Sequence, residues 1–318
     1  MNSGALPSSM VGVGITITGM NVGVLVSEFQ RHRRAPLAVY GWLGGAVLIT
    51  GELLMFRGVP PVATYFTPIA WTAYILLADA SVRAVTGHSR LQDEPLSFLG
   101  VALLSIPLWL IFEAYNLRLA NWTYVGVPVN RAGALLGYGW SFATITPGIF
   151  ETADLIEAFG WFEPSAPVEF SPAVRRGMIF FGAICLSVPL LVPQYVAAYL
   201  FVLVWIGFIF LLDPINFNRG LPSLLGDLAS GRRGRFYSLL LAGWVCGWLW
   251  EFWNNWAAAK WHYLFPMAQG WKIFEMPAPG YLGFLPFAWE CFVMYVAAVH
   301  VLEKAVTLNT SRRPPSEN

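Results

Sequence analysis

The chain has 318 residues, of which 57% are apolar and only 12% are charged, and its formal net charge is +1. Soluble domains carry about 25% charged residues, so this composition excludes an ordinary soluble domain. A net charge so close to zero gives no reason to expect a nucleic-acid partner. The composition instead predicts an integral membrane protein whose first partner is the lipid bilayer.

Eight apolar runs in the chain are long enough to cross a membrane. They lie near residues 36–56, 63–82, 96–118, 134–158, 175–194, 195–213, 235–258 and 281–302. The runs are continuous rather than alternating, and only helices or closed barrels satisfy the backbone inside lipid. We therefore predict an all-α, polytopic membrane bundle of about eight spans. A weakly hydrophobic, Gly-rich run at residues 10–27 is either a further span or an N-terminal extension.

The runs divide the chain into four parts. These are an N-terminal segment (1–35), a first four-helix unit (36–160), a second four-helix unit (174–303) and a tail (304–318) that we expect to be disordered. With eight spans, most of the 19 lysines and arginines fall on the side that holds the tail. The positive-inside rule then predicts a multi-pass protein of the inner (cytoplasmic) membrane with a cytoplasmic C-terminus.

The two four-helix units share a set of spaced residues. Residues 113–124 read EAYNLRLANWTY and residues 251–263 read EFWNNWAAAKWHY, so that each has a Glu, an Asn three residues later and a W-x-Y. Upstream, each unit has a Trp eight residues before an Asp; downstream, each has a Pro four residues before a Glu. These pairs are Trp71 and Asp79, Trp205 and Asp213, Pro147 and Glu151, and Pro286 and Glu290. We predict a four-plus-four parallel tandem repeat with a site at the interface of the two copies.

Four acids within the apolar runs are the candidate catalytic residues: Glu251, Glu290, Glu113 and Glu151. An ionised acid at a helix centre costs about 2.5–3.5 kcal/mol, so intramembrane acids are candidates for function. The lysines and arginines cluster in the loops and at the ends of the runs, so the sequence offers none in the interior of the runs to neutralise these acids. A carboxyl group that stays neutral in a dry site is a good proton donor. The alternative is that these acids only pair with polar groups of neighbouring helices.

Aromatic and polar residues around these acids are the candidate substrate-binding residues. They are Trp244, Trp248, Trp250, Trp253, Asn116, Asn254, Asn255, Trp261, Tyr263, Trp122, Tyr124, Asp79 and Asp213. Aromatic faces attract cations by about 2 kcal/mol or more when desolvated, which suits a carbocation intermediate. Each type also has a structural alternative: interfacial anchoring for Trp122 and Trp261, helix–helix hydrogen bonds for the asparagines, and helix-end contacts for the aspartates.

Each unit has a helix ending in a carboxylate, a W-x-Y in the next loop and a Pro-x-x-x-Glu on the next helix. This pattern, present twice, resembles the membrane lycopene cyclase domain and related carotenoid-modifying membrane proteins, including hydratases. The resemblance covers roughly residues 63–157 and 195–302, and it departs from the family in having single acids in PGIFET and PFAWEC. It implies a redox-neutral, acid-initiated reaction on isoprenoid chain ends. It places Glu113, Trp122, Glu151, Glu251, Trp261 and Glu290 at the site.

The leading hypothesis is therefore an integral membrane enzyme of isoprenoid or carotenoid-type lipid metabolism that cyclises or hydrates an alkene. Two alternatives stay open: a proton-coupled membrane transporter and a non-catalytic lipid-binding membrane protein. The three cysteines form no CxxC and no Asp-rich pair is present, so we expect no metal and no cofactor. The sequence leaves the oligomeric state open.

Overall fold

The computed structural model describes residues 8–311, and most of them are helical. The longer helices are α1 (Ser8–His32), α2 (Val39–Phe56), α3 (Phe66–Thr86), α5 (Pro95–Leu119), α8 (Pro172–Leu191), α10 (Phe201–Asn218), α12 (Gly234–Trp256) and α13 (Tyr281–Ser311). The shorter helices are α4 (Arg90–Asp93), α6 (Arg131–Ala143), α7 (Ile145–Ala158), α9 (Gln194–Ala197), α11 (Leu224–Ala229) and the 3-10 turn η1 (Ala278–Gly280). The strands are β1 (Trp122–Val125), β2 (Lys260–Tyr263), β3 (Lys272–Ile273) and β4 (Met276–Pro277).

Seven helices among the described residues are long and apolar enough to cross a membrane: α1, α2, α3, α5, α8, α10 and the helix that begins at η1 and continues as α13. A multi-pass, helical membrane protein is thus confirmed, but the set differs from the eight predicted spans. The run at 10–27 is part of a full-length helix, α1. The run at 235–258 forms α12, which is 23 residues long but rich in tryptophan and asparagine, and it is not among the seven.

The predicted span at 134–158 is broken into α6 and α7 at Thr144. Pro147 lacks an N–H, and the break puts it in the first turn of α7, where no helical hydrogen bond is lost. The buried Ser105 of α5 holds the break together. Its hydroxyl donates to the Phe142 carbonyl at 2.6 Å and accepts from the Thr146 N–H at 3.1 Å. A backbone break inside the bundle is tolerated because a side chain satisfies the freed groups.

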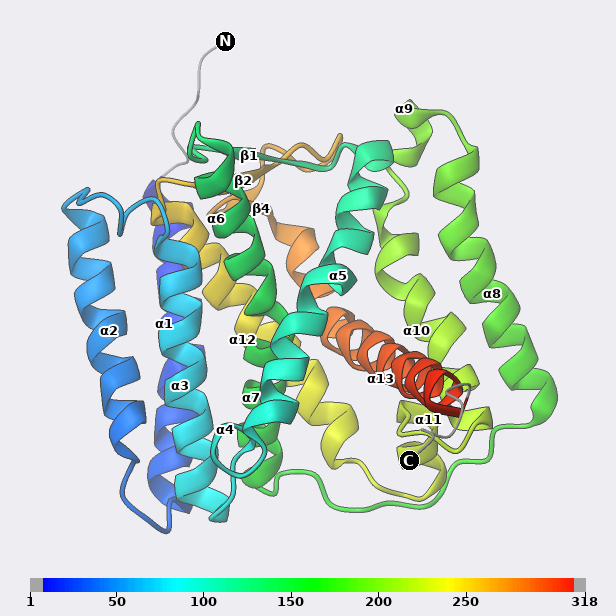
Figure 1. Ribbon diagram of the computed structural model, residues 1–318. Coiled ribbons are helices and arrows are strands. Elements are labelled where there is room, and N and C mark those ends of the chain that lie inside the picture. Colours follow the sequence, from blue (N-terminus) through cyan, green and yellow to red (C-terminus); the bar gives the residue numbers. More distant parts are fainter. Residues whose placement is uncertain (1–7, 312–318) are drawn as a thin grey trace, which may run out of the picture.

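The helices form one bundle with a shared core (Figure 1). In the view of Figure 1, α1, α2 and α3 lie on one side and α8 and α10 on the other, with α5, α7, α12 and α13 between them. Helix α2 packs on α3, α8 packs on α10, and α12 packs on both α7 and α13. The core therefore contains residues from both predicted four-helix units, and the two units are not separate bodies.

A two-stranded ribbon lies at one end of the bundle and joins the two units (Figure 1). Strand β1 comes from the first unit and pairs in antiparallel register with β2 of the second. Trp122 lies opposite Tyr263, and Tyr124 lies opposite Trp261. Thus each unit's W-x-Y is paired with the other's. Gly126 closes β1 with a φ of 67°, and an added Cβ would lie 2.0 Å from the Ala258 carbonyl oxygen, so this turn requires glycine.

Residues 304–311 of the predicted tail contain no glycine or proline and belong to helix α13, which continues through Ser311. The rest of the predicted tail, residues 312–318, lies outside the described residues, as do residues 1–7 of the predicted N-terminal segment.

Candidate functional site

The Glu113 carboxylate accepts three hydrogen bonds from aromatic side chains. Its Oε1 atom accepts from the Trp109 indole at 2.8 Å, from the Trp122 indole at 3.1 Å and from the Tyr124 hydroxyl at 2.5 Å. Trp109 lies one turn before Glu113 on α5, whereas Trp122 and Tyr124 both come from β1. On a strand, residues two apart point to the same face, so the W-x-Y spacing directs both donors at one acid.

Glu251 is held in the same way in the second unit. Its Oε1 atom accepts from the Tyr263 hydroxyl at 2.9 Å and, at 3.4 Å, from the Trp261 indole. The Glu251 side chain is fully buried, and its Oε2 atom has no hydrogen-bond partner. The position that matches Trp109 is Gly247, so this acid has two aromatic donors where Glu113 has three.

The two asparagines of the shared pattern fix the strands on which these donors lie. Asn254 Nδ2 donates to the Trp261 carbonyl at 2.9 Å, and its Oδ1 accepts from the Trp261 N–H at 2.9 Å. Asn116 makes the same pair of bonds to Trp122, at 2.9 and 3.2 Å, and also accepts from the Asn121 N–H. Each Asn therefore binds the backbone of the Trp whose indole donates to the acid one helical turn earlier.

The two tyrosines of the ribbon lie outside the long helices and stay protonated. Burial, followed by the charge of Glu113, raises the pKa of Tyr124 well above its ordinary value. Burial, followed by the charge of Glu251, does the same for the pKa of Tyr263. Both phenols therefore keep the hydrogen that they donate to their carboxylates.

An aromatic cavity of about 130 Å³ lies under the ribbon between the two units. Its walls include six tryptophans, four tyrosines and three phenylalanines: Trp71, Trp109, Trp122, Trp205, Trp250, Trp261, Tyr65, Tyr124, Tyr138, Tyr263, Phe142, Phe284 and Phe287. The few other polar side chains that line it belong to Thr64, Thr67, Ser141 and Lys260. The walls are thus mostly aromatic, and both units contribute to them.

Five of the predicted substrate-binding residues line this cavity: Trp122, Tyr124, Trp250, Trp261 and Tyr263. The other predicted substrate-binding residues lie elsewhere; they are Trp244, Trp248, Trp253, Asn116, Asn254, Asn255, Asp79 and Asp213. Trp248 stacks on Tyr281, with ring centroids 3.8 Å apart, and Trp253 donates to Glu52 of α2 at 3.0 Å. The helix face that carries Trp244, Trp248 and Asn255 is therefore not the face of α12 that reaches the cavity through Trp250.

The predicted aspartates bind backbone amides at the end of the bundle away from the ribbon. Asp79 accepts from the Leu91 N–H at 2.9 Å and from the Tyr40 hydroxyl at 2.6 Å. Asp213 accepts from the Leu224 and Leu225 N–H groups at 2.7 and 2.9 Å. Each carboxylate thus contacts backbone in or beside the short helix that follows its span, α4 or α11.

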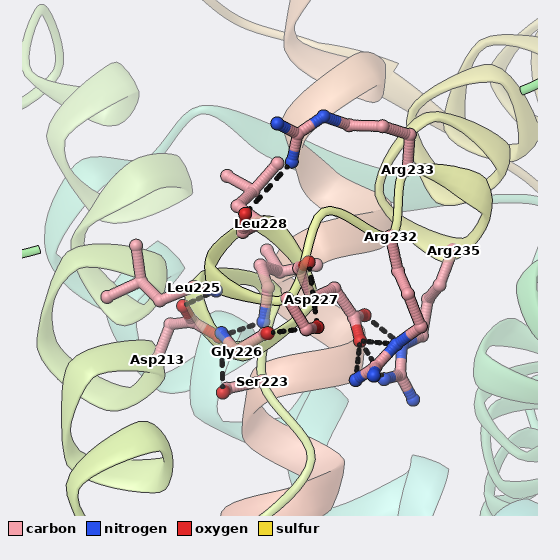
Figure 2. Close-up of polar contacts among 11 residues, drawn as sticks. Asp213, Ser223, Leu225, Gly226, Asp227, Leu228, Arg232, Arg233 and Arg235 are labelled. Atoms are coloured by element: carbon pink, nitrogen blue, oxygen red, sulfur yellow. Dashed lines mark hydrogen bonds and ion pairs between the residues drawn. The ribbon is translucent and has the colours of Figure 1, made fainter. Parts of the chain in front are cut away.

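Asp227 of α11 binds the arginines that open α12 (Figure 2). Arg232 and Arg235 both donate to its carboxylate, with ion-pair distances of 3.0 and 2.6 Å. Arg233 turns to the Leu228 carbonyl instead. Together with Asp213, these contacts hold the turn between α10 and α12, and none of these residues lines the aromatic cavity.

The four candidate acids are all outside the cavity lining of the described residues. Glu113 and Glu251 lie behind the tyrosines and tryptophans of the ribbon, which do line it. Glu290 is fully buried, with no side-chain partner for either carboxylate oxygen. Glu151 is also fully buried, and neither of its oxygens has a hydrogen-bond partner, although its Oε1 lies 3.9 Å from Arg90 Nε. At Glu113 and Glu251, the residues that donate hydrogen bonds to the acid are therefore the ones that line the cavity.

The expectation that no arginine reaches the acids is wrong at one place. Arg90 is the first residue of the short helix α4, which follows α3, and its guanidinium binds Asp154 at 2.6 and 3.1 Å, beside Glu151. The sequence did not indicate this contact because Arg90 lies outside the apolar runs. A long arginine side chain can nevertheless extend well past its own backbone position.

Much of the cavity wall comes from residues that the sequence reasoning did not assign to the site. Trp71 and Trp205 line the cavity, but the sequence shows them only as tryptophans eight residues before an aspartate. Their matching positions in the two units are the sequence feature that points to a shared role. Trp109 has a signal of its own, because it lies four residues before Glu113 and so shares its helix face. Tyr65 and Tyr138 carry no motif that points to a site.

In comparisons with known proteins, no family model, no curated protein and no solved structure matches this chain.

Proposed function

We propose that the protein is an integral membrane enzyme that starts the cyclisation or hydration of an alkene in an isoprenoid or carotenoid-type lipid by protonating it. One observation carries the proposal. The cavity between the units is walled by six tryptophans, and two of these, with two tyrosines, donate from the ribbon to Glu113 and Glu251 directly behind them. A third, Trp109, also donates to Glu113.

These hydrogen bonds suit the walls to a positively charged intermediate. Ring faces attract cations, most strongly where water is excluded. An indole N–H or phenol O–H that donates to a carboxylate shifts electron density into its ring. A glutamic acid that has given up its proton becomes a carboxylate just outside the wall, so charge that develops on the substrate is stabilised by a group already in place.

Each tyrosine hydroxyl provides a route for the proton. In the acid form, the glutamic acid O–H donates to the tyrosine oxygen while the phenol hydrogen passes to the alkene carbon, leaving a glutamate and a carbocation. In cyclisation, the cation adds to a second double bond and then loses a proton through the other Tyr–Glu pair. In hydration, water adds to the cation and releases the proton. Either way, one proton enters and one leaves, with no redox partner.

The matched contacts also support the predicted tandem repeat. Glu113, Trp122 and Tyr124 in the first unit correspond to Glu251, Trp261 and Tyr263 in the second, contact for contact. We propose that the units are parallel copies related by a pseudo-two-fold axis that passes between Thr123 and His262 of the ribbon. We further propose that the protein lies in the inner membrane with the C-terminal end of α13 in the cytoplasm, following the basic residues.

The test is expression of the chain in a bacterium that makes lycopene, followed by pigment analysis. We expect a new cyclised or hydrated pigment from the wild type, and its loss from Glu251→Gln and Tyr263→Phe. Glu303→Gln is the matched control, because Glu303 is exposed on α13 far along the chain from the ribbon. Unchanged pigments from well-expressed wild-type protein would contradict carotenoid chemistry.

A non-catalytic lipid-binding protein is the second candidate, and one observation favours it: no acid lines the cavity in the described residues. In that case Glu113→Gln and Glu251→Gln would leave ligand binding intact, because glutamine still accepts from the aromatic donors. Loss of ring area, as in Trp250→Ala, would reduce binding. If the protein is an enzyme, Glu113→Gln and Glu251→Gln should instead abolish product formation.

A further inference from the structure

The aromatic cavity adjoins a depression on the bundle surface. Thr64, Tyr65, Val127 and Pro128 line both the cavity and a more open depression between the α2–α3 loop and the β1–α6 loop. The depression also includes residues 60–61 and 129–130. The cavity is therefore continuous with the outside through a mouth between these two loops, next to the ribbon.

The rim of this mouth is apolar and exposed. Val129 is fully exposed, and Leu135 and Leu136 of α6 are 60% and 59% exposed. Val59 on the α2–α3 loop and Val125 at the end of β1 are also more than a third exposed. Exposed apolar side chains on a membrane protein face lipid at little cost, whereas in water they form a patch that needs a partner. The apolar rim is thus suited to contact with lipid.

The cavity admits a small group without a charge. A volume of about 130 Å³ is close to the cavity of about 150 Å³ that holds benzene, so it takes one ring-sized group and not a whole lipid. A phosphate or carboxylate headgroup would lie among aromatic side chains, and the described part of the lining offers no free cation to bind it. Among the described residues, the one charged side chain in the lining is Lys260, whose ammonium donates to the Asn255 carbonyl at 3.0 Å and lies 3.8 Å from Glu275.

Tyr65 stands in the mouth. Its hydroxyl donates to the Gly133 carbonyl of α6 at 3.2 Å. A Cβ added at Gly133 would lie 2.9 Å from that hydroxyl, and one added at Gly137 would lie 3.4 Å from the Tyr65 ring. Two glycines one turn apart on α6 thus make the space in which the Tyr65 ring lies, held there by a single hydrogen bond between neutral groups.

We infer that the cavity takes the apolar terminus of a long unsaturated hydrocarbon chain, which enters end first from the bilayer past Tyr65, while the remainder of the chain lies outside along α6. The inference deepens the proposed function by naming which part of the substrate is bound. Entry itself involves no reaction, so it is tested separately from catalysis.

The experiment uses the full chain in lipid nanodiscs and two photoreactive probes. Both are linear polyprenyl alcohols; one carries a diazirine at the hydrocarbon terminus and the other carries it beside the hydroxyl. After illumination, peptide mass spectrometry locates the crosslinks. We expect the terminal label on cavity residues such as Tyr138, Trp250 and Phe284, and the hydroxyl-side label only on residues outside the cavity.

Two substitutions on α6 separate entry from general damage. Gly137→Leu fills the space at the mouth and removes the cavity crosslinks of the terminal probe. Gly139→Leu is the matched control, because an added Cβ there has no neighbour within 4 Å, and its crosslinks stay as in the wild type. Thermal unfolding of both variants checks that each is folded.

Cavity crosslinks from the hydroxyl-side probe, or terminal crosslinks confined to lipid-facing residues, would overturn the inference. Persistence of the cavity crosslinks in folded Gly137→Leu would overturn the assigned mouth. If the terminal probe labels the cavity but the pigments of the lycopene-producing strain are unchanged, the inference about chain entry is supported and the proposed carotenoid chemistry is contradicted.

Discussion

Replacement of Asn254 by alanine tests whether the asparagines hold the ribbon on which the site depends. Asn254 is fully buried, and its loss leaves both the N–H and the carbonyl of Trp261 without the partners they have in the structure. A buried polar group left unsatisfied costs about 1–3 kcal/mol, so we expect Asn254→Ala to lower the free energy of unfolding by about 2–4 kcal/mol.

Asn116→Ala is the matched comparison in the other unit. It removes the same two bonds to Trp122 and a third to the Asn121 N–H, but Asn116 is partly exposed and water can replace some of its contacts. We therefore expect a smaller loss, of about 1–2 kcal/mol. Asn116 makes more hydrogen bonds than Asn254, yet we expect its loss to lower the free energy of unfolding by less, because Asn254 is the more deeply buried of the two.

The assay is thermal unfolding in detergent, followed with a thiol-reactive fluorescent dye. Cys185, Cys246 and Cys291 are all buried and free, so the dye reports their exposure without any added cysteine. At about 2 °C per kcal/mol, the expected shifts are roughly 4–8 °C for Asn254→Ala and roughly 2–4 °C for Asn116→Ala. A midpoint for Asn254→Ala equal to or above that of Asn116→Ala would refute the reasoning from burial.

Three further predictions concern the backbone and the ribbon. Ser105→Ala leaves the groups at the break between α6 and α7 unpartnered, and we expect it to destabilise the protein by about 1–3 kcal/mol in the same dye assay. Gly126→Ala forces a Cβ against the Ala258 carbonyl in a left-handed turn, and we expect it to lower the free energy of unfolding by about 1–3 kcal/mol. Gly19→Ala on α1 is the control, because an added Cβ there has no neighbour within 4 Å. The raised pKa of Tyr263, caused first by burial, means that the folded chain keeps a proton which the unfolded chain releases above about pH 10. Stability therefore falls as the pH rises past 10, and Tyr263→Phe should show a smaller fall between pH 9 and pH 11; an equal fall in both proteins would contradict this.

The local contacts of the ribbon follow spacings that are visible in the sequence, although the sequence analysis did not predict the hydrogen bonds themselves. A Glu, an Asn three residues later and a W-x-Y mark the Glu113 contacts, and the same spacing marks those around Glu251. Whether the acids face a cavity is a different question. It depends on which side chains of other helices come between, and no spacing within one segment contains that information.

The parts that the sequence did not predict are set by contacts between distant segments. The cross-pairing of Trp122 with Tyr263 requires the two ribbon strands to meet in antiparallel register. The break at Thr144 is stabilised by Ser105, nearly forty residues earlier. Arg90 reaches Asp154 from α4, which follows another span. Apolar composition finds spans well, but α12 shows that a helix at the centre of a bundle need not be very apolar, since its neighbours are protein rather than lipid.

The two units match in their polar contacts but not in the space that they enclose. The alignment that pairs Glu151 with Glu290 also pairs Gly148 with Phe287. At Gly148, an added Cβ would lie 2.8 Å from the Trp71 ring, so glycine lets that ring settle against α7. Phe287 instead fills the corresponding place and itself lines the cavity beside Trp205, with ring centroids 5.1 Å apart.

The mouth is lined by residues of the first unit, the unit that contains this glycine. Helix α6 forms one wall of the cavity in the first unit, whereas the chain of the second unit has β3, β4 and η1 between its ribbon strand and α13. The matched acids and donors therefore lie beside unequal walls, and Glu113 and Glu251 have different surroundings. The proposed acid-initiated reaction requires such an inequality, because one group must give a proton while the other takes one.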